Sequence, residues 1–158
     1  MNEMSKIVRT VANLVYGFVI IFGFYIIVHG HLTPGGGFQG GAVVASAFAL
    51  LLISYGSLNV KRYLKKELLS ILESVGLAIF AIIAFLGIGI TFFYNFLANI
   101  GNWFGDTPIL GINPGNMNTG GVIPFMNMAV GLEVLSALGV IVLIMAIGAE
   151  FTRKKENS

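Results

Sequence analysis

The sequence predicts an all-α integral membrane protein with four transmembrane helices and both termini on the cytoplasmic side. Three observations lead to this fold class: a shortage of charged residues, four long apolar runs, and positive charges confined to alternate connections. The chain is 56% hydrophobic and 10% charged, whereas a soluble domain carries about 25% charged residues. So few charged side chains do not cover a water-facing surface, and the mean hydropathy of +0.89 agrees.

The four apolar runs approach the roughly 20 residues that a helix needs to cross the hydrocarbon core of a bilayer. The predicted spans are residues 11–28, 38–55, 68–94 and 124–149, within a single membrane domain over residues 1–158. An outer loop is expected at residues 95–123. The first run is longer than the apolar region of a signal peptide and has no clear cleavage site, which favours a first span over a cleaved signal.

All nine Lys and Arg residues fall before the first predicted span, between the second and third, or after the fourth. They are Lys6, Arg9, Lys61, Arg62, Lys65, Lys66, Arg153, Lys154 and Lys155. The other two connections contain none. Because cytoplasmic loops carry the excess of Lys and Arg, we expect both termini in the cytoplasm and the other two connections on the opposite side.

The stretch GHLTPGGGFQGG, Gly30–Gly41, lies between the first two apolar runs. Its proline cannot donate a backbone hydrogen bond, and its first three consecutive glycines accept positive φ, so we expect a tight hairpin. The next glycine pair falls in the first turn of the following helix, where another backbone can approach closely. The residues expected to form the hairpin and its outer rim are His29, His31, Pro34, Gly35, Gly36, Gly37, Gln39, Gly40 and Gly41.

Two carboxylates, Glu73 and Glu133, fall well inside predicted spans. An ionisable residue in hydrocarbon costs about 2.5–3.5 kcal/mol on insertion scales unless it faces a cavity or a partner. One interpretation is that these residues line a proton or cation path. The alternative is that they are protonated or paired with a neighbouring subunit. Their expected polar neighbours along the helices are Ser70 and Ser74 for the first, and Asn127 and Ser136 for the second.

The sequence lacks the motifs of several kinds of binding or catalytic site. With no cysteine, it lacks the residues for disulfides, thiolate metal sites or iron–sulfur ligation. His29 and His31 are two residues apart with no third ligand near, so we expect no metal site; the alternatives for them are turn hydrogen bonding and proton entry. The glycine run lacks the Gly-Lys-Ser/Thr end of a phosphate-binding loop. We therefore expect no nucleotide, nucleic acid or cofactor, and no catalytic activity of the chain by itself.

On the stretch Gly30–Gly41, the chain resembles the B subunit of Mrp-type (Mnh) multisubunit cation/proton antiporters, a similarity that covers about the first 60 residues. The last apolar run usually carries an aspartate followed by Leu-Gly in bacterial relatives, whereas this chain has Glu133. The later run NTGGVIPFMNMAVGLEVLSALGVIV, Asn118–Val142, is more similar to the B-like subunits of the archaeal membrane-bound hydrogenase and sulfane reductase complexes.

The resemblance implies a multi-pass subunit of the cell membrane, with other membrane subunits, sodium ions and protons as its partners. It implies a role in a sodium/proton translocating module, within an archaeal ferredoxin-linked complex such as membrane-bound hydrogenase or sulfane reductase. The alternative is a purely structural subunit of a stand-alone Na⁺/H⁺ antiporter with no ion path of its own. A self-sufficient small transporter would need a polar stripe along a helix, and no predicted span has one.

Overall fold

The computed structural model describes residues 3–32, 35–56, 65–98, 100 and 117–156. Four long helices run alternately in opposite directions: α1 (Lys6–His29), α2 (Gly36–Tyr55), α4 (Lys66–Leu86) and α5 (Ile123–Glu156), with a short 3₁₀ helix η1 (Met117–Gly120) before the last. Each long helix contains a segment long and apolar enough to cross a membrane. The predicted all-α fold with four membrane helices is confirmed, and the chain is a multi-pass membrane protein. The side that faces the cytoplasm remains a prediction.

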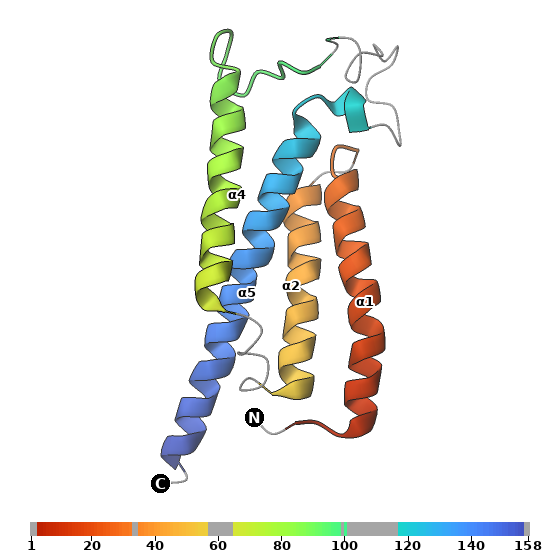
Figure 1. Cartoon of the computed structure of the whole chain (residues 1–158), viewed down its shortest axis with the longest axis vertical. Helices are drawn as coiled ribbons and strands as arrows, with labels where there is room; N and C mark the ends of the chain where they lie inside the picture. The colour runs from red at the N-terminus through yellow and green to blue at the C-terminus, as the bar shows by residue number, and fades with distance from the viewer. Residues whose placement is uncertain (1–2, 33–34, 57–64, 99, 101–116, 157–158) are drawn as a thin grey trace.

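The helices lie side by side in the order α4, α5, α2, α1, and α5 crosses the others at an angle (Figure 1). Helix α2 packs against α1 and α5, and α5 also packs against α4. Accordingly 44% of the membrane segment of α2 is buried, against 17% in both α1 and α4. The edge helices α1 and α4 therefore present most of their apolar side chains to lipid or to other subunits.

Helix α1 begins at Lys6, five residues before the predicted first span. The side chain of Ser5 caps it by accepting a hydrogen bond from the backbone N–H of Val8 at 3.4 Å, which satisfies one free donor of the first turn. The backbone N–H of Met4 also donates to the carbonyl oxygen of Ser54 at 3.1 Å. These contacts extend the helix beyond the apolar run and attach its start to the end of α2.

The hairpin between α1 and α2 needs glycine for two different reasons. Gly35 has φ of +80° and precedes the first residue of α2. Gly36 and Gly37 lie inside the helix, so the expectation of positive φ at all three positions is wrong for these two. A Cβ on Gly36 would collide with the backbone of Gly30, and one on Gly37 would lie 2.6 Å from the carbonyl oxygen of Asn127. Pro34 lies outside the described residues.

The expected close approach at the next glycine pair is confirmed. A Cβ on Gly40 would lie 2.7 Å from the carbonyl oxygen of Gly23 in α1. One on Gly41 would lie 2.8 Å from the carbonyl oxygen of Gly131 in α5. Missing side chains on both sides of α2 thus let it contact both neighbours through the backbone, as small residues do between membrane helices.

Helix α4 ends at Leu86, eight residues before the end of the predicted third span, so the C-terminal limit of that span is corrected. After Gly87 the chain turns back on the helix, and the backbone N–H of Phe93 donates to the carbonyl oxygen of Ala84 at 3.2 Å. The ring of Phe92 packs edge-on against Phe85, with centroids 5.1 Å apart. The apolar run continues through this return segment because its aromatic side chains cover the helix end. Helix α5, in contrast, continues to Glu156, past the predicted limit at residue 149.

Candidate functional site

Helices α4 and α5 approach each other closely at Gly76 and Glu133. A Cβ on Gly76 would lie 2.8 Å from the amide nitrogen of Glu133 and 2.8 Å from the carbonyl oxygen of Ala129. Glu133 is the eleventh residue of α5, so it lies about 15 Å along the helix by its rise of 1.5 Å per residue. A hydrocarbon core about 30 Å thick that began at the first residue of α5 would place this contact near mid-depth.

The second carboxylate lies one helical turn away. Glu73 precedes Gly76 by three residues and therefore shares the face of α4 that meets α5. Both Glu73 and Glu133 are half-buried. In the described part of the chain, neither carboxylate has a hydrogen bond or an ion pair. The structure thus places both predicted residues within one helical turn of the contact between Gly76 and Glu133, which the sequence did not predict.

Ser136 is the third oxygen-bearing side chain near this crossing. Its side chain is fully buried, at 0% exposure, and its Oγ has no hydrogen-bond partner among the described residues. It follows Glu133 by one turn. Helices α4 and α5 are antiparallel, and two contacts give their register. Gly76 lies beside Glu133, and Leu69, two turns earlier in α4, lies 3.5 Å from the Cβ position of Gly139 in α5. This register places Glu73 level with Ser136. The three oxygen-bearing side chains near the helix contact, Glu73, Glu133 and Ser136, are hereafter the crossing site.

The side chains of two other expected neighbours of the carboxylates, Ser74 and Asn127, contact other groups. The hydroxyl of Ser74 donates to the carbonyl oxygen of Ser70 at 3.0 Å and so is occupied by its own helix. Asn127 faces the hairpin, with its Nδ2 2.9 Å from the Cβ position of Gly30. Six residues separate Asn127 from Glu133, so at 3.6 residues per turn their side chains leave the helix in different directions.

The histidines of the hairpin occupy different environments. His31 is buried, and its Nδ1 lies 3.2 Å from the carbonyl oxygen of Val28. His29 is half-buried, with its ring stacked on Tyr25 at 5.0 Å and 6.0 Å from the ring of His31. Gln39 is exposed. Gln39 and part of His29 are thus accessible at the hairpin, whereas His31 is buried; that this end faces the outside remains a prediction.

Asn95 connects two segments far apart in the sequence, and sequence reasoning missed it. Its Nδ2 donates to the carbonyl oxygen of Gly120 at 3.1 Å, and its Oδ1 accepts from the backbone N–H of Val122 at 2.9 Å. Gly121, between these partners, has φ of +61°. These bonds fix the entry into α5. The available sequence signal was a lone polar side chain after an aromatic run, which does not identify a partner 25 residues away.

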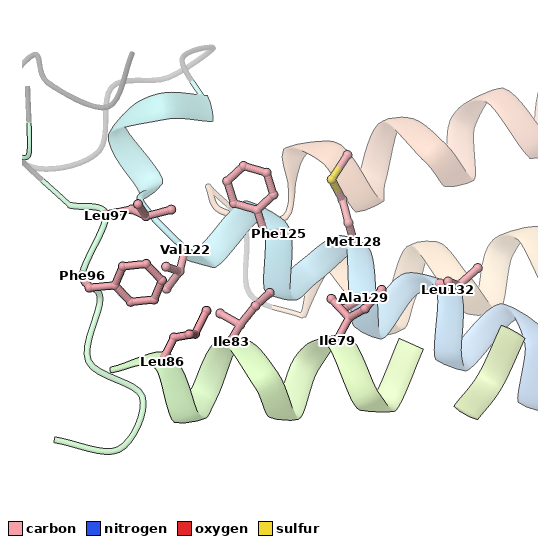
Figure 2. Close-up of a pocket in the computed structure, with 10 residues that line it drawn as sticks. All are labelled: Ile79, Ile83, Leu86, Phe96, Leu97, Val122, Phe125, Met128, Ala129 and Leu132. Carbon is pink, nitrogen blue, oxygen red and sulfur yellow. The ribbon is translucent and has the colours of Figure 1, made fainter. Parts of the chain in front are cut away.

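A groove of about 450 Å³ lies between α4, α5 and the segment after α4 (Figure 2). All its lining residues have apolar side chains, so the groove offers no side-chain ligand to an ion. It borders the contact of α4 with α5, because Ala129 lines it and the carbonyl oxygen of Ala129 lies 2.8 Å from the Cβ position of Gly76. They are Ile79, Ile83, Leu86, Phe96, Leu97, Val122, Phe125, Met128, Ala129 and Leu132.

The chemistry of the crossing site is limited to oxygen atoms. Two carboxylates and a hydroxyl can exchange protons or contribute ligands to a hard cation, which prefers oxygen donors. Among the described residues, no group of three or more His, Asp or Glu side chains gathers to hold a metal ion. The fold and the site define a multi-pass membrane protein with carboxylates at an internal helix crossing.

The chain belongs to the MnhB family: residues 7–140 match the model described as a domain related to the MnhB subunit of Na⁺/H⁺ antiporter. The expected resemblance to the B subunit of Mrp-type antiporters is confirmed.

Named relatives and a solved structure agree with this assignment. An uncharacterized protein of Methanocaldococcus jannaschii is 35% identical over 137 residues, which cover 87% of this chain and 50% of that protein. A Staphylococcus aureus protein (strain Newman) named for the antiporter subunit MnhB2 is 42% identical over 65 residues, 41% of this chain and 44% of that one. A chain of the membrane-bound sulfane sulfur reductase, an archaeal respiratory membrane complex, matches with a TM-score of 0.74 and 31% identity, covering 91% of this chain and 59% of that chain. The chain thus spans about half the length of the curated relatives that it matches.

Proposed function

We propose that this chain is a membrane subunit of an Mrp-type sodium/proton translocating module within an archaeal respiratory complex, where it assembles with other membrane subunits. The family match supports the antiporter module, and the likeness to a chain of the sulfane sulfur reductase supports the respiratory complex. On this proposal the chain contributes oxygen ligands to a path for sodium ions or protons.

The observation that carries the ion-path role is the crossing site. A half-buried carboxylate near mid-depth is costly unless it faces a cavity or a partner, and among the described residues Glu133 has no hydrogen bond or ion pair. Glu73 lies one turn before Gly76 in α4. The buried hydroxyl of Ser136 in α5 lies level with Glu73. The crossing site thus offers three oxygen-bearing side chains within about two turns of one helix contact, and such side chains suit stepwise movement of a proton or a small cation.

A structural role is the second candidate, and a specific observation favours it. Glycines give backbone contact between α1 and α2, between α2 and α5, and between α4 and α5. Such contacts suit a subunit whose task is to hold helices together, with the two glutamates protonated or paired across a subunit interface. This alternative describes an assembly subunit with no ion path of its own.

The experiment that separates the two candidates removes the chain from its complex. The complex is purified from its native membrane through a tag on another subunit, with and without this chain, and reconstituted into vesicles containing a trapped pH dye. If the chain contributes to the path, the remaining subunits stay together and sodium-driven pH change is lost. Dissociation of the remaining subunits favours the structural role. Unchanged exchange by an intact remainder contradicts the ion-path proposal.

A further inference from the structure

His31 presents a buried nitrogen that the function proposed above does not use. The side chain is 8% exposed, and its Nδ1 lies 3.2 Å from the carbonyl oxygen of Val28. A carbonyl oxygen can only accept, so Nδ1 carries the hydrogen, and Nε2 of the neutral ring is then an acceptor. That Nε2 is buried and has no hydrogen-bond partner among the described residues.

Asn127 presents a buried donor in the same neighbourhood. Its Nδ2 is buried and likewise has no partner among the described residues. It lies 2.9 Å from the Cβ position of Gly30, the residue before His31. On the other side, the Cβ position of Gly120 lies 3.4 Å from the Cβ of His31 and 2.9 Å from Pro124, one turn before Asn127. Glycines thus bring the hairpin, which carries His31, against the start of α5, which carries Asn127.

We propose that this place is a binding site for a water molecule, which donates a hydrogen bond to Nε2 of His31 and accepts one from Nδ2 of Asn127. Buried waters in proteins commonly bridge polar groups that lack a protein partner, and leaving such a group unpaired costs about 1–3 kcal/mol. A cation would face the amide hydrogens of Asn127, and an anion would face the lone pair of His31. Water suits both partners because it donates and accepts.

The site binds water in both protonation states of the histidine. When Nε2 carries a hydrogen, the water accepts from both side chains through its two lone pairs. The titratable group that faces His31 is His29, with ring centroids 6.0 Å apart. Helix α2, η1 and residues 123–132 of α5 contain no Asp, Glu, Lys or Arg. Occupancy by water, rather than a response to pH, is therefore the property to measure.

The test is radiolytic hydroxyl labelling of the full chain as purified from its native membrane, followed by mass spectrometry of its peptides. Radicals formed from a bound water modify the side chain beside it even when that side chain is buried. The site predicts fast labelling of His31 in the wild-type protein. Asn127→Leu, which keeps the size but removes both polar atoms, should slow this labelling roughly fivefold, the factor that corresponds to one hydrogen bond of about 1 kcal/mol.

Asn13→Leu is the matched control, because Asn13 is exposed on α1; it should leave the labelling of His31 unchanged. Slow labelling of His31 in the wild-type protein would overturn the proposal, and this result needs no variant to fold. Equal labelling in the wild-type and Asn127→Leu proteins would overturn it as well. A high-resolution density map should show the water within hydrogen-bond distance of both side chains, whereas direct contact between His31 and Asn127 would contradict the site.

Discussion

The backbone of Gly76 in α4 lies directly against the backbone of Glu133 in α5, with 2.8 Å between the Cβ position of the glycine and the amide nitrogen of the glutamate. No side chain separates the two helices at this point. The position of the Glu133 carboxylate therefore depends on a contact that a single methyl group would disturb.

Gly76→Ala should weaken the packing of α4 on α5. The added methyl group meets backbone atoms that move only with the whole helix, and such overpacking costs about 1–3 kcal/mol. The measurement is thermal unfolding of the purified protein. Gly17→Ala is the control, because nothing lies within 4 Å of its Cβ position. Equal stability of the two variants would contradict the backbone contact.

Gly37→Val should prevent normal folding of the hairpin. The reason is steric, since the Cβ would lie 2.6 Å from the carbonyl oxygen of Asn127 and 3.1 Å from Val130. The yield of monodisperse protein after detergent extraction measures this effect. Gly17→Val carries the same β-branched substitution on the open face of α1 and should extract normally. A normal yield of the Gly37 variant would show that the hairpin does not pack against α5 as described.

Much of the fold could be predicted because membrane helices follow from local composition. The four apolar runs and the glycine-rich turn identify the helices and the hairpin. The end of α4 could not be located, since residues 88–94 continue the apolar run while folding back on the helix. The roles of Gly36 and Gly37 were misassigned because their neighbours, Gly30 and Asn127, come from other elements.

Local composition predicted part of the candidate site as well, whereas contacts between different elements were not predicted. Glu73 and Glu133 stand out as carboxylates in apolar runs, but their common place at one crossing depends on the register of α4 against α5. Asn127 was expected beside Glu133 and instead faces the hairpin. The partners of Asn95 lie 25 and 27 residues away, a separation at which sequence pattern gives no pairing.

Asn95→Leu should destabilise the entry into α5. The substitution removes the donor to the carbonyl of Gly120 and the acceptor for the N–H of Val122, and each backbone group left unpaired costs about 1–3 kcal/mol. Limited proteolysis of the segment before α5 measures the loss of order. The exposed Asn13→Leu on α1 should be cleaved as slowly as the wild-type protein. No increase in cleavage for the Asn95 variant would argue against the two bonds.

The orientation in the membrane can be tested with single cysteines, because the chain contains none. Ile90 and Lys66 are both exposed and lie at opposite ends of the α4 region. The positive-inside rule predicts that an impermeant thiol reagent added outside intact cells labels Ile90→Cys and spares Lys66→Cys. Disrupted cells should label at both positions. Labelling of Lys66→Cys in intact cells would reverse the predicted topology.

The central claim, that the carboxylate of Glu133 takes part in ion movement, is tested most directly by sodium-driven pH change in vesicles containing the complex with Glu133→Gln. Glutamine keeps the shape and most of the hydrogen-bonding capacity but cannot gain or lose a proton. We expect intact assembly with exchange lost in Glu133→Gln and partial exchange in Glu133→Asp. Exchange should be normal in Glu67→Gln, which changes an exposed glutamate in the first turn of α4. Intact assembly with unchanged exchange at every pH in Glu133→Gln would contradict the claim.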